Sequence, residues 1–167
     1  MQFSEGKCVV YRSSERCRVI GVELKFVVGV RVREEWILCP INSAGATYYV
    51  PLDCAEDKLR ELLTKEQVLG LIDGMRNTET EWCDDGNERK ARHNEILSGS
   101  NYSRIIGMTR SLYSEKEKRS AQGKKLLAAD ERAMKAAETL INREFGYVLG
   151  IEENMVSKFI KERLGEA

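Results

Sequence analysis

Residues 64–72 read TKEQVLGLI, and the spacing of the apolar residues changes at this point in the chain. Thr64 followed three residues later by Gln67 has the spacing of a capping box, in which two side chains bond the first free N–H groups of a helix. The apolar residues that follow recur at helical spacing. We therefore predict a helix that begins at Thr64.

The chain after this start keeps the helical spacing. Further helices are predicted over residues 87–97, 103–117 and 125–149, with a last one after Gly150. No proline follows Pro51, so no residue there would interrupt a helix. Residues 77–86 are polar and irregular. Asp84 and Asp85 at their end lack the spaced ligands of a calcium loop, and we predict that they cap the next helix.

The first third of the chain instead has apolar residues at every second position. The predicted strands cover residues 8–11, 18–26, 35–41 and 47–52. Four or five short antiparallel strands can bury a core by curling into a barrel. The predicted fold class is therefore α+β. An SH3- or Tudor-like β-barrel over residues 1–58 is followed by a compact all-α helical domain over residues 64–167.

The composition is that of a folded protein, with 42% hydrophobic and 32% charged residues. The five cysteines are odd in number and include no CxxC pair, which argues against a disulfide framework and a zinc ribbon. The chain has no apolar run of about 18 residues and no segment typical of a signal peptide. These features predict a cytoplasmic protein with reduced thiols and no membrane association.

The sequence lacks the parts of a recognisable active site. His93 is the only histidine, and without a spaced partner it is expected to be a surface residue. The chain contains no serine motif of the nucleophile-elbow type and no glycine-rich loop between a strand and a helix. We therefore predict no enzymatic activity, no metal, no cofactor and no small-molecule substrate.

Positive charge is concentrated in one region although the whole chain has equal numbers of acidic and basic residues, 27 of each. Between residues 86 and 125 we count ten Lys and Arg but only four Glu. Such a segregated patch favours nucleic-acid binding, because affinity for a phosphate backbone comes largely from releasing counterions.

Trp82 lies just upstream of this basic region, in polar surroundings. Two interpretations remain open from the residues alone. The side chain can pack beneath its loop as the anchor of a small apolar cluster, which composition favours. Alternatively, it can insert between base steps or stack on an unpaired base.

Several short motifs occur one after another along nearly the whole chain. The first region contains FxxGxxVVY at residues 3–11 and YVP at residues 49–51. The second contains TEW at 80–82, NERK at 87–90, ILSG at 96–99, GKKL at 123–126, ADE at 129–131 and EFGYVLGI at 144–151. Together they resemble the CarD/CdnL-like family of bacterial regulators that bind RNA polymerase.

The resemblance implies a mechanism. The barrel is expected to bind the RNA polymerase β subunit, and the helical domain to bind the minor groove of promoter DNA without sequence specificity. Trp82 is the implied wedge at the upstream edge of the transcription bubble. The other implied DNA-binding residues are Asn87, Arg89, Lys90, Arg92, Lys124 and Lys125. The implied RNA polymerase-binding residues are Lys25, Tyr49, Val50 and Pro51.

The chain departs from the family pattern at two places on the polymerase side. Residues 12–16 read RSSER where the family has Pro and a turn containing Gly, and Tyr49 stands where some members have Arg. The leading expectation is a non-catalytic regulator that stabilises the open promoter complex. The alternatives are an adaptor of RNA polymerase with no direct DNA contact, and a metal-dependent nuclease.

Overall fold

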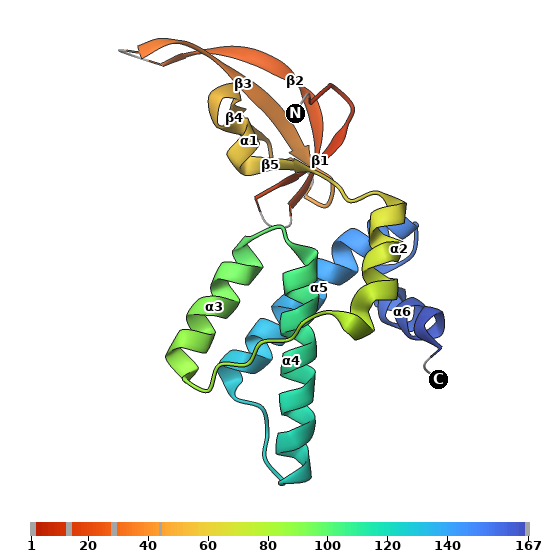
Figure 1. Ribbon diagram of the computed structural model, residues 1–167. Coiled ribbons are helices and arrows are strands. Elements are labelled where there is room, and N and C mark those ends of the chain that lie inside the picture. Colours follow the sequence, from red (N-terminus) through yellow and green to blue (C-terminus); the bar gives the residue numbers. More distant parts are fainter. Residues whose placement is uncertain (1–2, 13–14, 28–29, 44, 166–167) are drawn as a thin grey trace. The chain divides into compact units, whose positions relative to one another are not determined.

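The computed structural model describes residues 3–12, 15–27, 30–43 and 45–165. Ser13 and Ser14, within the stretch that departs from the family pattern, lie outside the described residues. The chain divides into two compact units, Met1–Leu62 and Leu63–Ala167. The first is built on an antiparallel sheet and the second is helical, so the fold is mixed α+β (Figure 1).

The first unit contains one antiparallel sheet with the strand order β4-β3-β2-β1-β5. Its strands are β1 (Cys8–Tyr11), β2 (Glu15–Val27), β3 (Val30–Pro40), β4 (Tyr48–Pro51) and β5 (Leu59–Glu61). A 3-10 turn, η1 (Leu52–Cys54), and the short helix α1 (Ala55–Lys58) connect β4 to β5. Within the described strands, β4 and β5 are the two edges and do not pair with each other, so the sheet is open.

A small core fills one face of this sheet. Val9, Cys17, Val19, Leu38 and Val50 are fully buried there. The alternation of apolar and polar residues along the strands produces this arrangement, because successive side chains of a strand point to opposite faces.

The first unit extends to Leu62, beyond residue 58, where the predicted barrel domain ended. Leu59 is buried in the sheet core, and β5 pairs with β1. A strand of three residues is too short to show an alternating pattern, which is why the sequence did not reveal it.

The second unit contains five α-helices and two 3-10 turns within its described residues. They are α2 (Lys65–Gly74), η2 (Met75–Asn77), α3 (Gly86–Ser98), α4 (Tyr102–Ala121), α5 (Ala128–Leu149), η3 (Glu153–Met155) and α6 (Val156–Leu164). The predicted capping box is confirmed. The Gln67 N–H donates to Thr64 Oγ1 over 3.2 Å, and the Thr64 N–H donates to Gln67 Oε1 over 2.8 Å.

Two helix ends differ from the expected ones. Helix α4 extends to Ala121, and α5 begins at Ala128 rather than at residue 125. Gly123 has a φ of 68°, a left-handed conformation that favours glycine. This turn ends α4 and leaves the two lysines after it, Lys124 and Lys125, in the loop.

The helical core is formed mainly by α4 and α5, with α2 and α6 packed on them (Figure 1). Its fully buried side chains include Ile72, Ile105, Leu112, Phe145 and Val156. Within the described residues, no helix combines the length and the apolar character needed to cross a membrane.

An extended segment, residues 78–85, connects η2 to α3 and passes against α4. Gly107 of α4 makes this close approach possible. A Cβ added there would lie 2.4 Å from the carbonyl oxygen of Glu79, closer than atoms tolerate. The segment can lie this close to α4 only because residue 107 is a glycine and has no side chain.

We expect Gly107→Ala to lower the free energy of unfolding by about 1–3 kcal/mol, because the segment must move away from α4. Gly70→Ala is the matched control, since Gly70 is also helical and a Cβ there meets nothing within 4 Å. The control should instead stabilise the protein by roughly 0.5–1 kcal/mol. Urea unfolding followed by circular dichroism measures both. Equal effects of the two variants would contradict the assigned contact.

Candidate nucleic-acid interface

Arg89, near the start of α3, is buried and fully engaged inside the helical unit. Its Nε and Nη2 donate to the two carboxylate oxygens of Asp130, in α5, over 3.0 and 2.9 Å. Its Nη1 donates to the carbonyl oxygens of Cys83 and Asp84 over 2.7 and 3.2 Å. The hydrogen bonds from Asp130 raise the pKa of Arg89 above its ordinary value, so the guanidinium stays charged.

This geometry does not fit the expectation that Arg89 contacts a DNA phosphate. Arg89 is only 5% exposed and Asp130 only 2%. A buried charge that loses its partner is strongly destabilising, so Arg89 cannot leave Asp130 for a phosphate without disrupting the fold. Its role here is structural: it ties the end of the extended segment to α5.

Trp82 is half-buried and packs against the helical core. The guanidinium carbon of Arg89 lies 4.5 Å from the centre of its ring, a cation–π contact. The packing that composition favoured is therefore present. The tryptophan is also held in one place by an arginine that is itself fixed by Asp130.

One edge of Trp82 still lines an open hollow of about 230 Å³ on the surface of α4. The other lining residues are polar or charged: Thr80, Arg110, Ser111, Ser114, Glu115 and Lys118. Hydroxyl groups and cations beside an aromatic edge are suited to a nucleotide, since they can bond phosphate or a base edge.

His93 is buried, which corrects the expectation of a surface residue. Its Nδ1 lies 3.9 Å from Oδ1 of Asp130. Burial lowers the pKa of His93. The nearby carboxylate of Asp130 opposes that shift and the Arg89 charge adds to it. The ring therefore stays neutral at pH 7 and packs beside the ion pair.

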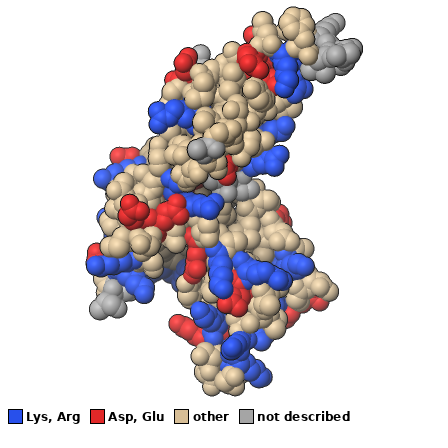
Figure 2. Space-filling model, turned by 180° about the vertical axis from the view of Figure 1, so that it is seen from behind, with Lys and Arg blue, Asp and Glu red and all other residues tan. Residues whose placement is uncertain are grey.

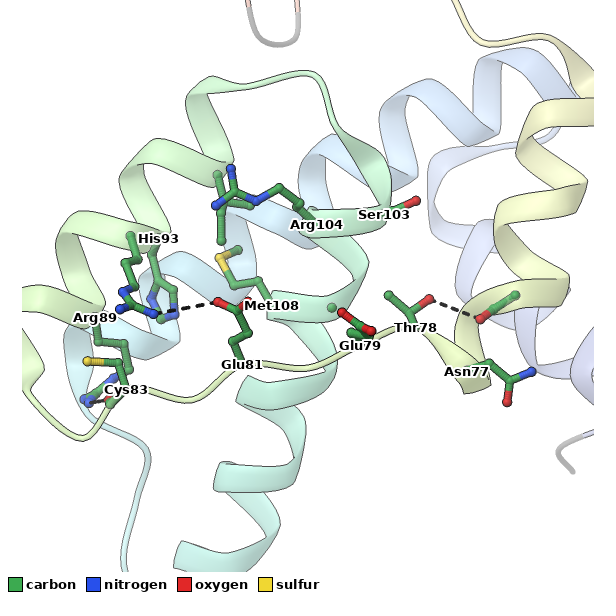
Figure 3. Close-up of a pocket in the computed structure, with 14 residues that line it drawn as sticks. Asn77, Thr78, Glu79, Glu81, Cys83, Arg89, His93, Ser103, Arg104 and Met108 are labelled. Carbon is green, nitrogen blue, oxygen red and sulfur yellow. Dashed lines mark hydrogen bonds and ion pairs between the residues drawn. The ribbon is translucent and has the colours of Figure 1, made fainter.

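A second and larger hollow, of about 410 Å³, lies between the extended segment, α3 and α4 (Figure 3). His93, Arg104 and Met108 line it from the helices, and Glu79 and Glu81 from the segment. Its walls carry both signs of charge, so the hollow itself shows no preference for an anion or a cation.

The remaining predicted DNA-binding side chains are exposed. Asn87 and Lys90 lie on the first turns of α3, and Lys124 and Lys125 lie in the loop before α5. The Arg89–Asp130 pair joins the first turns of these two helices, so it brings the two groups to the same end of the helical unit. Within the described residues, no ion pair involves Lys90, Lys124 or Lys125, and these ammonium groups are available to solvent.

Arg92 is exposed but already paired, with Glu88 at 2.7 Å and with Glu81 at 3.7 Å. Surface pairs of this kind contribute little stability, about 0–1 kcal/mol, so a phosphate can replace them. Figure 2 shows Lys and Arg interspersed with Asp and Glu on the face it draws. Acidic residues also lie at the first turns of α3 and α5, among them Glu88 and Glu131, so the charge there is mixed as well.

The predicted polymerase-binding residues divide into two kinds. Lys25 and Tyr49 are exposed and adjacent, with Nζ of Lys25 4.7 Å from the centre of the Tyr49 ring. Val50 and Pro51 are buried in the sheet unit. Val50 lies in the sheet core and Pro51 is buried on the face that carries Tyr49, so of the four only Lys25 and Tyr49 present side chains to a partner.

Four residues of this region were not assigned from the sequence. Asp130 and Gly107 position the Trp82 segment, and Ser111 and Ser114 line the hollow beside the ring. A carboxylate 41 residues from its arginine leaves no local pattern in a sequence. Within the described part of the chain, no group of three or more His, Cys, Asp or Glu side chains is placed to hold a metal ion.

The chain was also compared with known proteins. It matches no model of a protein family, and no curated protein matches it significantly.

We expect Asp130→Asn to lower the free energy of unfolding by about 3–5 kcal/mol, because it leaves the Arg89 charge buried without its partner. Glu131→Gln is the control, since Glu131 is exposed and its ion pair with Lys135 is a surface pair. It should change stability by less than about 0.5 kcal/mol. In a Trp36→Phe background, Trp82 fluorescence at low urea should shift to the red only in Asp130→Asn. An unshifted spectrum would mean that Arg89 does not hold the ring.

His93 should make the stability depend on pH. Its pKa in the folded state lies below the ordinary value of 6.5, so the unfolded chain takes up the proton first as the pH falls. The free energy of unfolding should therefore decrease as the pH falls below about 6.5. Because His93 is the only histidine, His93→Gln should flatten the dependence between pH 7.5 and 5.5. Urea midpoints measured across this range test it, and parallel curves for the two proteins would contradict the assignment.

Proposed function

We propose that this protein is a non-catalytic transcription regulator that stabilises the open promoter complex. Its sheet unit binds the RNA polymerase β subunit through Lys25 and Tyr49. Its helical unit binds promoter DNA at the upstream edge of the melted region, in the minor groove and without sequence specificity. It acts in the cytoplasm of a bacterial cell, and the resemblance to CarD/CdnL-like proteins supports this assignment.

The observation that carries the proposal is the fixed position of Trp82 among exposed cations. A wedge between base steps needs a rigid aromatic side chain, because any freedom it has before binding is lost on insertion. Arg89 supplies that rigidity through its contact with the Trp82 ring, and Asp130 holds Arg89 in place. Lys90, Lys124 and Lys125 are exposed near the ends of α3 and α5 that the Arg89–Asp130 pair joins, and in this proposal they contact phosphates.

The sheet unit belongs to the same proposal. We interpret its five strands as a Tudor-like module in which the two edges stay apart. The contact between Lys25 and Tyr49 gives it a surface that combines a cation with an aromatic ring, and aromatic residues are enriched at protein interfaces.

The alternative is an adaptor that binds RNA polymerase and has no DNA contact. It is favoured by the internal engagement of Arg89 and by the acidic partners of Arg92. The two functions differ in what the exposed lysines do. Lysines that contact phosphate change DNA binding when their charge is reversed, whereas lysines of an adaptor do not.

The test follows promoter opening by purified RNA polymerase holoenzyme with a fluorescent base in the melted region. We expect the wild-type protein to lengthen the lifetime of the open complex, and Trp82→Ala to lose most of this effect while still binding polymerase. Lys124→Glu/Lys125→Glu should also weaken the effect. Lys135→Glu is the matched control, because Lys135 is exposed on α5 beyond the first turn.

Salt adds a second readout. With four exposed cations at the interface (Lys90, Arg92, Lys124 and Lys125), DNA affinity should fall roughly 100-fold between about 50 and 200 mM salt. An open-complex effect that survives Trp82→Ala and both charge reversals would favour the adaptor. No effect of the wild-type protein on opening would reject the regulator, and polymerase binding without such an effect would leave the adaptor.

A further inference from the structure

The long β2–β3 hairpin carries an apolar surface that the proposed function does not use. β1 pairs with β2 only as far as Arg18, and β4 pairs with β3 only from Glu35 onward. Beyond these pairings, in the described residues, β2 and β3 pair only with each other and form a two-stranded ribbon.

An irregularity in β2 decides which side chains lie on each face of this ribbon. Val19 pairs with Leu38, but Gly21 pairs with Ile37, so Ile20 is an extra residue in the strand. The alternation therefore shifts by one at this bulge. Cys17 and Val19 face the core before it, and Val22 and Leu24 continue the same face after it. Val22 lies opposite Trp36, whose side chain packs against the core.

No described part of the chain covers the ribbon residues that lie on the same face as the sheet core. Val22, Leu24, Phe26 and Val32 are 44%, 62%, 82% and 47% exposed, and we call these four residues the apolar strip. Large apolar side chains that line up on one face of a strand are unusual at a free surface, and they mark interaction sites.

The strip leads to an acidic hollow at the base of the ribbon. This hollow, of about 630 Å³, lies between the edge of the Trp36–Phe3 ring pair and the η1–α1 turn. Among the described residues that line it are three carboxylates, Asp53, Glu56 and Asp57, and no lysine or arginine. Glu34, opposite Leu24 on the ribbon, is also exposed. An aromatic ring flanked by carboxylates attracts a cation.

The other face of the ribbon has a different chemistry. Lys25 and Arg33 form ion pairs with Glu35, and Lys25 contacts Tyr49. These residues include the proposed polymerase contacts. The apolar strip and the acidic hollow therefore form a separate surface, and an occupant of the strip does not compete for Lys25 and Tyr49.

We propose that the apolar strip and the acidic hollow bind a segment of a second protein. The segment carries two or three large apolar side chains, which cover Leu24 and Phe26, and a lysine or arginine that enters the hollow beside Trp36. Charge complementarity identifies this occupant. A second copy of the chain would bring the same carboxylates toward one another, which is unfavourable.

The experiment pans a phage-displayed library of random dodecapeptides against the full-length protein. We expect the enriched peptides to combine aromatic or aliphatic residues with at least one lysine or arginine. A synthetic, fluorescein-labelled enriched peptide then reports affinity by anisotropy. Phe26→Ser should weaken binding roughly tenfold or more, as for a central interface residue. Asp53→Asn/Asp57→Asn should weaken it and reduce its sensitivity to salt.

Lys25→Gln is the matched control, because Lys25 adjoins Phe26 on the same strand and faces the other way. It should leave the peptide affinity unchanged. Phe26 is exposed, so its replacement should not alter the thermal unfolding midpoint, and this separates lost binding from lost folding.

Several results would overturn the proposal. No enrichment, enriched peptides that lack a basic residue, or equal binding to wild type and Phe26→Ser would each do so. So would sedimentation showing a dimer that Phe26→Ser dissociates, because the strip would then bind a second copy. None of these outcomes depends on the transcriptional role, which Trp82→Ala tests separately.

Discussion

The buried ion pair between Arg89 and Asp130 organises the helical unit. It joins α3 to α5 across 41 residues of sequence, and the same guanidinium bonds the carbonyls that end the extended segment and stacks on Trp82. Three parts of the chain therefore meet at one side chain. Such a pair adds little net stability compared with apolar packing, but it is directional. The cation–π contact with Arg89 adds to the packing of Trp82 against the helical core.

The local features of the helical unit were predictable from the sequence because short-range chemistry determines them. The capping box at Thr64 and the cap at Asp85, which accepts from the Glu88 N–H, each depend on residues three apart. Arg89 and His93 were harder for the opposite reason. Both looked like surface residues of a polar helix, and both are buried because of Asp130, a residue that only the tertiary fold brings near them.

In the sheet unit too, features set by neighbouring residues were predictable and features set by residues far apart in the sequence were not. The alternating pattern identified the strands up to β4, but not whether the edges would meet, because closure depends on twist and on a strand of three residues. The predicted polymerase-binding residues were assigned by position, from a resemblance to a family. Position alone did not separate exposed Lys25 and Tyr49 from buried Val50 and Pro51. Alternation separates Tyr49 from Val50, but Pro51 shares the face of Tyr49 and is buried by the tertiary fold.

The extra residue at Ile20 reverses which face of the sheet the following side chains of β2 point to. The faces of Val22 and Leu24 in β2 follow from that extra residue, and a second register shift lies between Lys25 and Val27. Deleting one residue between Val19 and Val22 would present lysine and glutamate where leucine and phenylalanine now lie. During divergence of such a chain, tolerated length changes in this part of β2 should therefore occur in steps of two.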